Sequence, residues 1–200
     1  MACNDPQHIK KKIIRCALPE VIFDGWNLRL IDKCARECGF DPDVVGALFP
    51  SGISDVLLYY SNYCDDIMLD EMSNIDQKNM RIRDQVSLAV KTRFEILNQH
   101  REASKLAASY WSVPTRAGQA GKLVWQSADK IWLWAGDTAT DYNRYTKRAL
   151  LSGILSSSAL VWMSDEATGL DKTKAFIDRR IEDVMKLNKL LFKFKKRENA

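Results

Sequence analysis

A chain of 200 residues, with 46% hydrophobic and 28% charged residues, is long enough for a sizeable core, and this balance excludes a disordered or fibrous protein. The net charge of +4 is unevenly placed: the first hundred residues hold 12 Lys and Arg against 15 Asp and Glu, whereas the second hundred hold 18 against 11. Any attraction to phosphate groups or to an anionic membrane is therefore expected from the second half.

The expected elements are all helices, because apolar residues recur at helical spacing and no alternating β-branched run is present. Asn27 is a good cap for the second helix, Gly39 ends it, and Asp141 is expected to cap the helix that follows it. Pro19 should interrupt the first helix. The sequence predicts an all-α fold of about nine helices, at residues 8–24, 27–38, 42–49, 51–69, 80–98, 102–111, 115–135, 142–164 and 170–196.

The first part of the chain resembles the helix-turn-helix of the TetR repressor family, most clearly in the segment GFDPDVVGALFPSGISDVLL, residues 39–58. The helix expected at 42–49 has no Lys or Arg, and residues 27–50 hold three cations against four anions. A DNA reader needs cations for phosphates and polar side chains for base edges. We therefore predict a degenerate helix-turn-helix at residues 1–60 and no nucleic-acid partner; a TetR-type DNA-binding regulator with a small-molecule pocket is the alternative.

Five cysteines, an odd number, and no secretory signal favour free thiols in a reducing, cytoplasmic compartment. Cys34 and Cys38 share one helix face, but neither His8 nor His100 stands at ligand spacing, which favours core thiols over a metal site. No nucleophile elbow and no phosphate-binding loop appears. The sequence predicts neither an enzyme nor a cofactor.

The stretch WLWAGDTATDYNRYTKR, residues 132–148, is unusually rich in aromatic and charged residues around one glycine. Trp132 continues an apolar helical stripe and is expected to be buried. Aromatic and Arg side chains mixed at an exposed helix start are typical of protein interfaces. The predicted partner-binding residues are Tyr142, Arg144, Tyr145 and Arg148.

The segment DKIWLWAGDTATDYNRYTKRALLSGI resembles the motif of the lipid-binding accessory family of ubiquinone biosynthesis, the ninth of the coenzyme Q biosynthesis proteins. TKAFIDRRIEDVMKL, residues 173–187, is similar to a second run of that family. The motif is matched at Trp132, Ala135, Gly136, Asp137, Thr140, Asp141, Tyr142, Asn143, Tyr145, Thr146, Lys147 and Arg148.

The resemblance implies a TetR-like fold, a homodimer formed through C-terminal helices, and an apolar pocket for isoprenoid quinone intermediates or phospholipids. It also implies a partner, the di-iron demethoxyubiquinone hydroxylase. Without a long transit peptide or a separate membrane helix, a bacterial-type member is expected, cytoplasmic and peripheral at the inner face of the membrane.

A carrier of this kind needs a tunnel lined by apolar and small side chains. We expect residues 61–200 to form the lipid-binding and dimerisation domain. The tail KLNKLLFKFKKR, residues 186–197, carries six cations beside an apolar edge and is expected to make a peripheral membrane contact; a last helix whose Leu face packs on the domain or on a dimer mate is the alternative. The predicted lipid-binding residues are Val124, Trp125, Ala128, Trp132, Leu150, Gly153, Ile154 and Val161.

Overall fold

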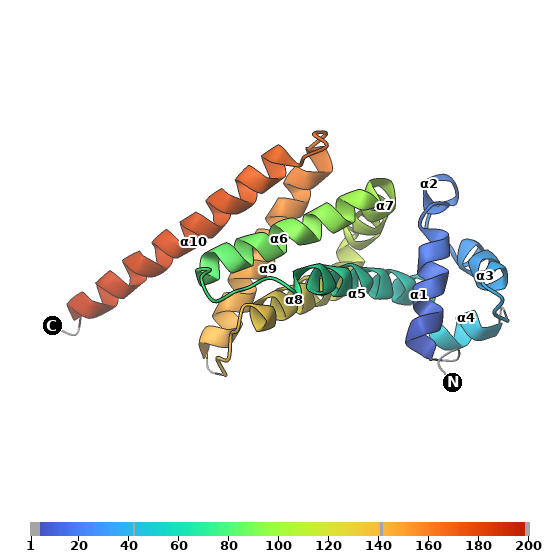
Figure 1. Cartoon of the computed structure of the whole chain (residues 1–200), viewed down its shortest axis with the longest axis horizontal. Coiled ribbons are helices and arrows are strands. Elements are labelled where there is room, and N and C mark those ends of the chain that lie inside the picture. Colours follow the sequence, from blue (N-terminus) through green and yellow to red (C-terminus); the bar gives the residue numbers. More distant parts are fainter. Residues whose placement is uncertain (1–4, 42, 141, 199–200) are drawn as a thin grey trace. The chain divides into compact units, whose positions relative to one another are not determined.

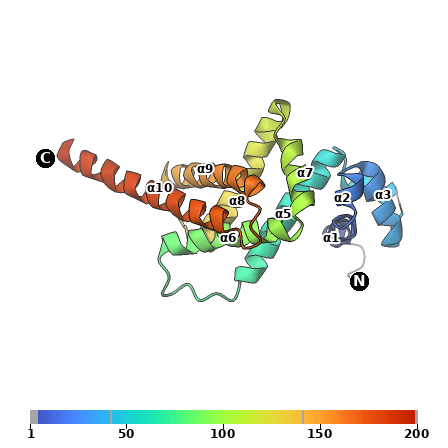
Figure 2. The ribbon, with the colours of Figure 1, turned by 90° about the horizontal axis from the view of Figure 1, so that it is seen from above.

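The computed structural model describes the backbone at residues 5–41, 43–140 and 142–198, and the side chains of these residues as far as Lys186. Two compact units are formed, one from residues 1–70 and 96–123 and the other from residues 71–95 and 124–200 (Figures 1 and 2). The described part of the chain contains ten α-helices and one 3-10 helix and no strand, which confirms the predicted all-α fold. The predicted division at residue 60 into functional domains stays a prediction.

The first unit begins with the helix-turn-helix arrangement. The chain turns at Pro19, so the first predicted helix is two helices, which raises the number from about nine to ten. The 3-10 helix η1 lies at Pro114–Arg116, and α8 then begins. The helices that belong wholly or mainly to this unit are α1 (Pro6–Ala17), α2 (Val21–Asp24), α3 (Leu28–Glu37), α4 (Asp43–Leu48), α5 (Ile53–Met72) and α7 (Arg101–Trp111).

Local polar groups fix the ends of these helices. Asp5 accepts a hydrogen bond from the amide of Gln7, and Asn27 accepts one from the amide of Leu30 at 3.0 Å, as the sequence predicts for Asn27. Gly39 follows α3 with a φ of 81°, a left-handed backbone that favours glycine. The predicted positions of Pro42 and Asp141 at helix starts lie outside the described residues.

The core of the first unit is formed where α1 packs on α3 and α3 on α4. Its fully buried side chains include Ile13, Ile14, Ile31, Cys34 and Leu57. The exposed residues of α4 are Asp43, Gly46 and Ala47, so this helix offers one carboxylate and no hydrogen-bond donor from a side chain. Within the described residues, the exposed face of α4 therefore offers no cation for a phosphate.

The second unit contains most of α6 (Ile82–Gln99) and α8 (Ala117–Trp134), together with α9 (Tyr142–Ser164) and α10 (Asp171–Glu198). Helices α9 and α10 pack side by side (Figure 2). Phe94 and Trp162 contact each other in the core, with 6.2 Å between ring centroids. Other fully buried residues are Ala89, Val90, Ala128, Ile131 and Ile177.

The short connection between α9 and α10 is held by a buried carboxylate. Asp165 accepts hydrogen bonds from the amide and the hydroxyl of Thr173, both at 2.8 Å, and so ties the loop to the first turn of α10. Leu170, which is buried, has a φ of 58° in the same loop. A connection this short makes α9 and α10 neighbours.

Within the described residues, no helix combines the length and the apolar character that a membrane span requires.

Candidate functional site

An apolar cavity of about 260 Å³ lies in the second unit, among side chains of α6, α8, α9 and α10. Most of its lining is aliphatic, and two cations stand among the apolar groups. Because it is lined by one aromatic ring and mainly branched side chains, it suits a hydrocarbon segment. The described lining residues are Ile82, Arg83, Val86, Trp132, Lys147, Leu150, Leu151, Ile154, Ile181, Val184 and Met185.

Three of the predicted lipid-binding residues lie together in this lining: Trp132, Leu150 and Ile154. They come from facing sides of α8 and α9, as the apolar stripes of those helices suggest. The other five lie outside the described lining, and of these Ala128 is buried in the core and Gly153 is exposed. The remaining three, all partly exposed, are Val124, Trp125 and Val161.

The sequence analysis did not predict that side chains of α6 and α10 also line this cavity. Val86, Ile181 and Val184 lie on the apolar stripes of those helices, and the first two are buried as such stripes predict; the stripes do not say which cavity they line. The short loop between α9 and α10 could have indicated that α10 lies next to α9, because short connections join antiparallel neighbours.

Trp132 is partly exposed, not buried as its apolar stripe predicted, and the start of α9 holds it as a wall of the cavity. Its indole Nε1 donates to the backbone oxygen of Lys147 at 3.1 Å, and the Lys147 ammonium lies 5.3 Å from the ring centroid. Lys147 is itself paired with Asp137, with 2.5 Å between Nζ and Oδ1. The wall therefore depends on charged groups as well as on apolar packing.

A buried ion network joins the end of α8 to the first turns of α9. Arg148 Nη1 lies 2.9 Å from Asp137 Oδ2, and Arg148 Nε also pairs with Asp129. The side chains of Arg148 and Asp137 are 1% and 4% exposed. Burial raises the pKa of Asp137, but the hydrogen bonds from Lys147 and Arg148 outweigh that effect and hold the pKa below its usual value.

This network corrects the expectation that Arg148 lies exposed beside the other partner-binding residues. The guanidinium turns inward because two carboxylates face it there, Asp129 of α8 and Asp137 of the loop that follows α8. Arg148 therefore supports the first turns of α9 from inside and does not present its charge at the surface.

The other predicted partner-binding residues do lie at the surface. Tyr142 is 82% and Tyr145 61% exposed, and the Tyr145 ring lies 6.4 Å from the ring of Trp125, centroid to centroid. Arg144 is partly exposed and reaches Asp129 at 3.3 Å. The start of α9 thus presents two tyrosines and one arginine outward.

Residues 117–188 match the family model of COQ9, and this range contains the ion network, both tyrosines and most of the cavity lining. This part of the chain, about a third of its length, is therefore similar to a COQ9 domain. The motif around Trp132 to Arg148, which carries the resemblance seen in the sequence, falls inside that domain.

The similarity to curated COQ9 proteins extends beyond the domain. The chain is 30% identical over 188 residues to the mitochondrial ubiquinone biosynthesis protein COQ9 of Rattus norvegicus and 28% identical to that of Homo sapiens; each alignment covers 90% of this chain. It is 26% identical to the probable mitochondrial ubiquinone biosynthesis protein coq9 of Dictyostelium discoideum, over 89% of this chain. The aligned region makes up 60%, 59% and 60% of these relatives, so the chain spans about three fifths of their length.

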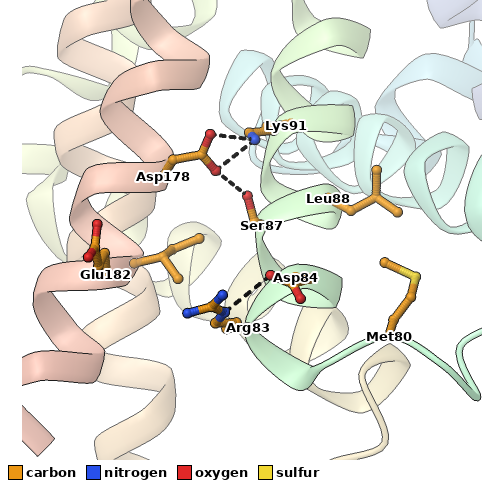
Figure 3. A pocket seen from close by; sticks show the side chains of 9 residues that line it. Met80, Arg83, Asp84, Ser87, Leu88, Lys91, Asp178 and Glu182 are labelled. Atoms are coloured by element: carbon orange, nitrogen blue, oxygen red, sulfur yellow. Dashed lines mark hydrogen bonds and ion pairs between the residues drawn. The ribbon is translucent and has the colours of Figure 1, made fainter.

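A second, larger pocket of about 570 Å³ lies between α6 and α10 and shares Arg83 and Ile181 with the apolar cavity (Figure 3). Its lining combines apolar side chains with charged ones. Asp178 of α10 accepts hydrogen bonds from Ser87 at 2.8 Å and from Lys91 at 2.7 Å, both on α6. Burial raises the pKa of Asp178, but Lys91 and Ser87 lower it more. These contacts join α10 to α6.

Proposed function

We propose that this chain is a lipid-binding accessory protein of ubiquinone biosynthesis, which presents an isoprenoid quinone intermediate to the demethoxyubiquinone hydroxylase without catalysing a reaction itself. The observation that carries the proposal is the apolar cavity of about 260 Å³, because most of the residues that line it lie in the part of the chain that matches the COQ9 family model. The relatives named above are ubiquinone biosynthesis proteins by name, which supports the pathway.

The size of the cavity limits how it would hold such a lipid. Small-molecule pockets span roughly 300–1,000 Å³, so a cavity just below that range takes one segment of a polyprenyl tail and not the whole molecule. Each CH₂ transferred from water gains about 0.8 kcal/mol, but almost nothing is gained when the CH₂ comes from a bilayer. A cavity that binds only a short hydrocarbon segment therefore suits a protein that must release its lipid to a partner.

The lining supports a binding role more than a catalytic one. Of the groups that serve as nucleophiles or general bases, its described residues include the amine of Lys147 and no carboxylate, hydroxyl, thiol or imidazole. Its polar groups are the cations Arg83 and Lys147, which are already paired with Asp84 and Asp137. A bound quinone head would find hydrogen-bond donors there.

The exposed start of α9 is the surface we propose for the hydroxylase. Tyr142 and Tyr145 are large, mostly exposed aromatics, and aromatic side chains are enriched among the residues that dominate binding energy. The same helix contributes Leu150, Leu151 and Ile154 to the cavity. A homodimer and a membrane contact through the C-terminal tail complete the proposal.

A lipid extraction tests the proposal. The protein and a mock purification are extracted with organic solvent, and the extracts are compared by mass spectrometry, together with those of Leu150→Trp and Leu160→Trp. Leu150 lines the cavity, whereas Leu160 lies on the same helix, is 71% exposed and is outside the lining.

We expect isoprenoid or phospholipid in the wild-type and Leu160→Trp extracts, and a loss of most of it in Leu150→Trp, because the indole fills the cavity. Leu150→Phe, a smaller change, serves if Leu150→Trp does not fold. Wild-type protein with no lipid above the mock level, or equal lipid in both Trp variants, would overturn the lipid-carrier function.

A further inference from the structure

Three metal-ligating side chains of the first unit converge between the end of α1 and the end of α3. They are Cys16, Cys34 and Glu37, and one donor atom of each lies within 4.8 Å of the other two. The Cys16 thiol donates a hydrogen bond to Glu37 Oε2 at 3.3 Å. Cys34 is buried, Cys16 is partly exposed and Glu37 is exposed, so the cluster has a closed side and a side open to solvent.

Helix packing holds these groups in place. Helix α1 packs on α3 through fully buried side chains that include Ile13 and Ile31. Cys34 and Glu37 stand three residues apart on α3, a spacing that places both side chains on one face. The backbone that carries the ligands is therefore rigid before any ion binds.

One of the three donor separations is close to that of a tetrahedral zinc site, and the other two are at most 4.8 Å. With Zn–S bonds of about 2.3 Å and Zn–O bonds of about 2.1 Å, tetrahedral angles place two sulfurs about 3.8 Å apart and a sulfur and an oxygen about 3.6 Å apart. The Cys16–Glu37 separation of 3.3 Å is close to the second value, and the 4.8 Å limit on the remaining pairs leaves only small rotamer adjustments.

The described charged groups around the cluster include one cation that is already paired. The nearby ammonium of Lys33 is engaged mainly by Glu20 and stands 3.8 Å from Glu37.

We propose that Cys16, Cys34 and Glu37 form a binding site for a thiophilic divalent cation of the zinc class. When the ion binds, each thiol releases its proton to solvent, two sulfur–metal bonds and one oxygen–metal bond form, and a water completes the fourth position on the open side. The ion links α1 to α3 and so stabilises the helix-turn-helix unit. This site is independent of the proposed lipid function.

The expectation of core thiols rested on Cys34 and Cys38 and on the absence of a histidine at ligand spacing. The structure assembles a different set: Cys38 directs its thiol to the backbone oxygen of Lys12 at 3.7 Å, and Cys16 takes its place beside Cys34. Cys16 belongs to a different helix, and the spacing of residues within one helix cannot reveal a ligand of that kind.

The test uses the full chain, reduced and freed of metal, and titrated with Cd²⁺ or Zn²⁺ alone. We expect one Cd²⁺ per chain, seen as ultraviolet thiolate-to-metal charge-transfer absorption, and a higher melting temperature with Zn²⁺. Cys16→Ala should lose the absorption, and Glu37→Gln should bind more weakly. Cys64→Ala is the matched control, because Cys64 is a buried cysteine outside the cluster.

If a cysteine variant does not fold, Glu37→Gln still tests the site, because Glu37 is exposed and its substitution leaves the core intact. No charge-transfer absorption from folded, reduced wild-type protein would overturn the site. So would absorption that persists in Cys16→Ala, or that disappears in Cys64→Ala but not in the cluster variants.

Discussion

Replacing Arg148 by alanine removes the cation at the centre of the ion network between α8 and α9. Within the described network, Asp137, 4% exposed, would then be paired with Lys147 alone, and the partly exposed Asp129 would keep Arg144. Breaking a buried ion pair by removing one partner costs about 3–5 kcal/mol. Because both carboxylates retain a partner, we expect a loss near the lower end, about 3 kcal/mol.

The measurement is thermal and denaturant unfolding followed by circular dichroism. A loss of about 3 kcal/mol corresponds to a fall of roughly 6–12 °C in melting temperature for a chain of this length. Arg144→Ala is the matched control: it removes the same kind of side chain one turn earlier, but this side chain is 39% exposed and its pair with Asp129 is worth at most about 1 kcal/mol.

The pH dependence checks the same reasoning. The folded-state pKa of Asp137 is held below its unfolded value of about 3.9, so its stabilising contribution is present above that pH and is lost as the pH falls through the folded value. The stability difference between wild type and Arg148→Ala should therefore shrink below about pH 4. Equal melting of Arg148→Ala and wild type, with weakened hydroxylase binding, would refute the inward role and place Arg148 on the partner surface.

Two further predictions concern the surfaces. Tyr145→Ala should weaken hydroxylase binding by about 2 kcal/mol, roughly 30-fold in Kd, and leave the melting temperature unchanged, because the ring is 61% exposed. Biolayer interferometry and a melt check this, and a lower melting temperature with full affinity would make Tyr145 a core residue. Cutting the chain after Lys186 should abolish flotation with phosphatidylglycerol vesicles and leave the oligomeric state unchanged, because each tail cation adds about 1 kcal/mol at an anionic surface. Unchanged flotation, or a collapse to monomer, would show that another surface meets the membrane.

Helix positions could be predicted because their signals are local. Asn27 caps the helix that it begins, and Pro19 interrupts the helix in which it lies, within a few residues of where each acts. The helix expected at 142–164 agrees with α9 at both ends. The 28 residues of α10 likewise begin one residue after the expected start, at Asp171.

The inward turn of Arg148 could not be read from the same local signals. Its partners Asp129 and Asp137 lie 19 and 11 residues earlier, and an aromatic, cationic helix start looks the same whether an arginine faces solvent or a buried carboxylate. The walls from α6 and α10 and the pairing of Cys16 with Cys34 were missed for the same reason. Each of these features depends on which helices pack against each other, and the periodicity of apolar residues within one helix does not specify its neighbours.

The residues from Trp132 to Arg148 fall into two groups, according to whether their side chains point into the protein or toward solvent. Trp132 and Lys147 line the cavity, and Asp137 and Arg148 are buried behind them in the ion network. Tyr142 and Tyr145, on the same first turns of α9, face outward. Helical spacing alone does not separate the two sets, because Tyr145 and Arg148 are three residues apart; the carboxylates of Asp129 and Asp137 draw Arg148 inward. The indole hydrogen bond to the Lys147 backbone fixes Trp132 to the turn that carries Tyr145. A lipid that displaced Trp132 would therefore act on the turn that presents Tyr145, so the proposed lipid binding and the proposed partner binding would share one structural element.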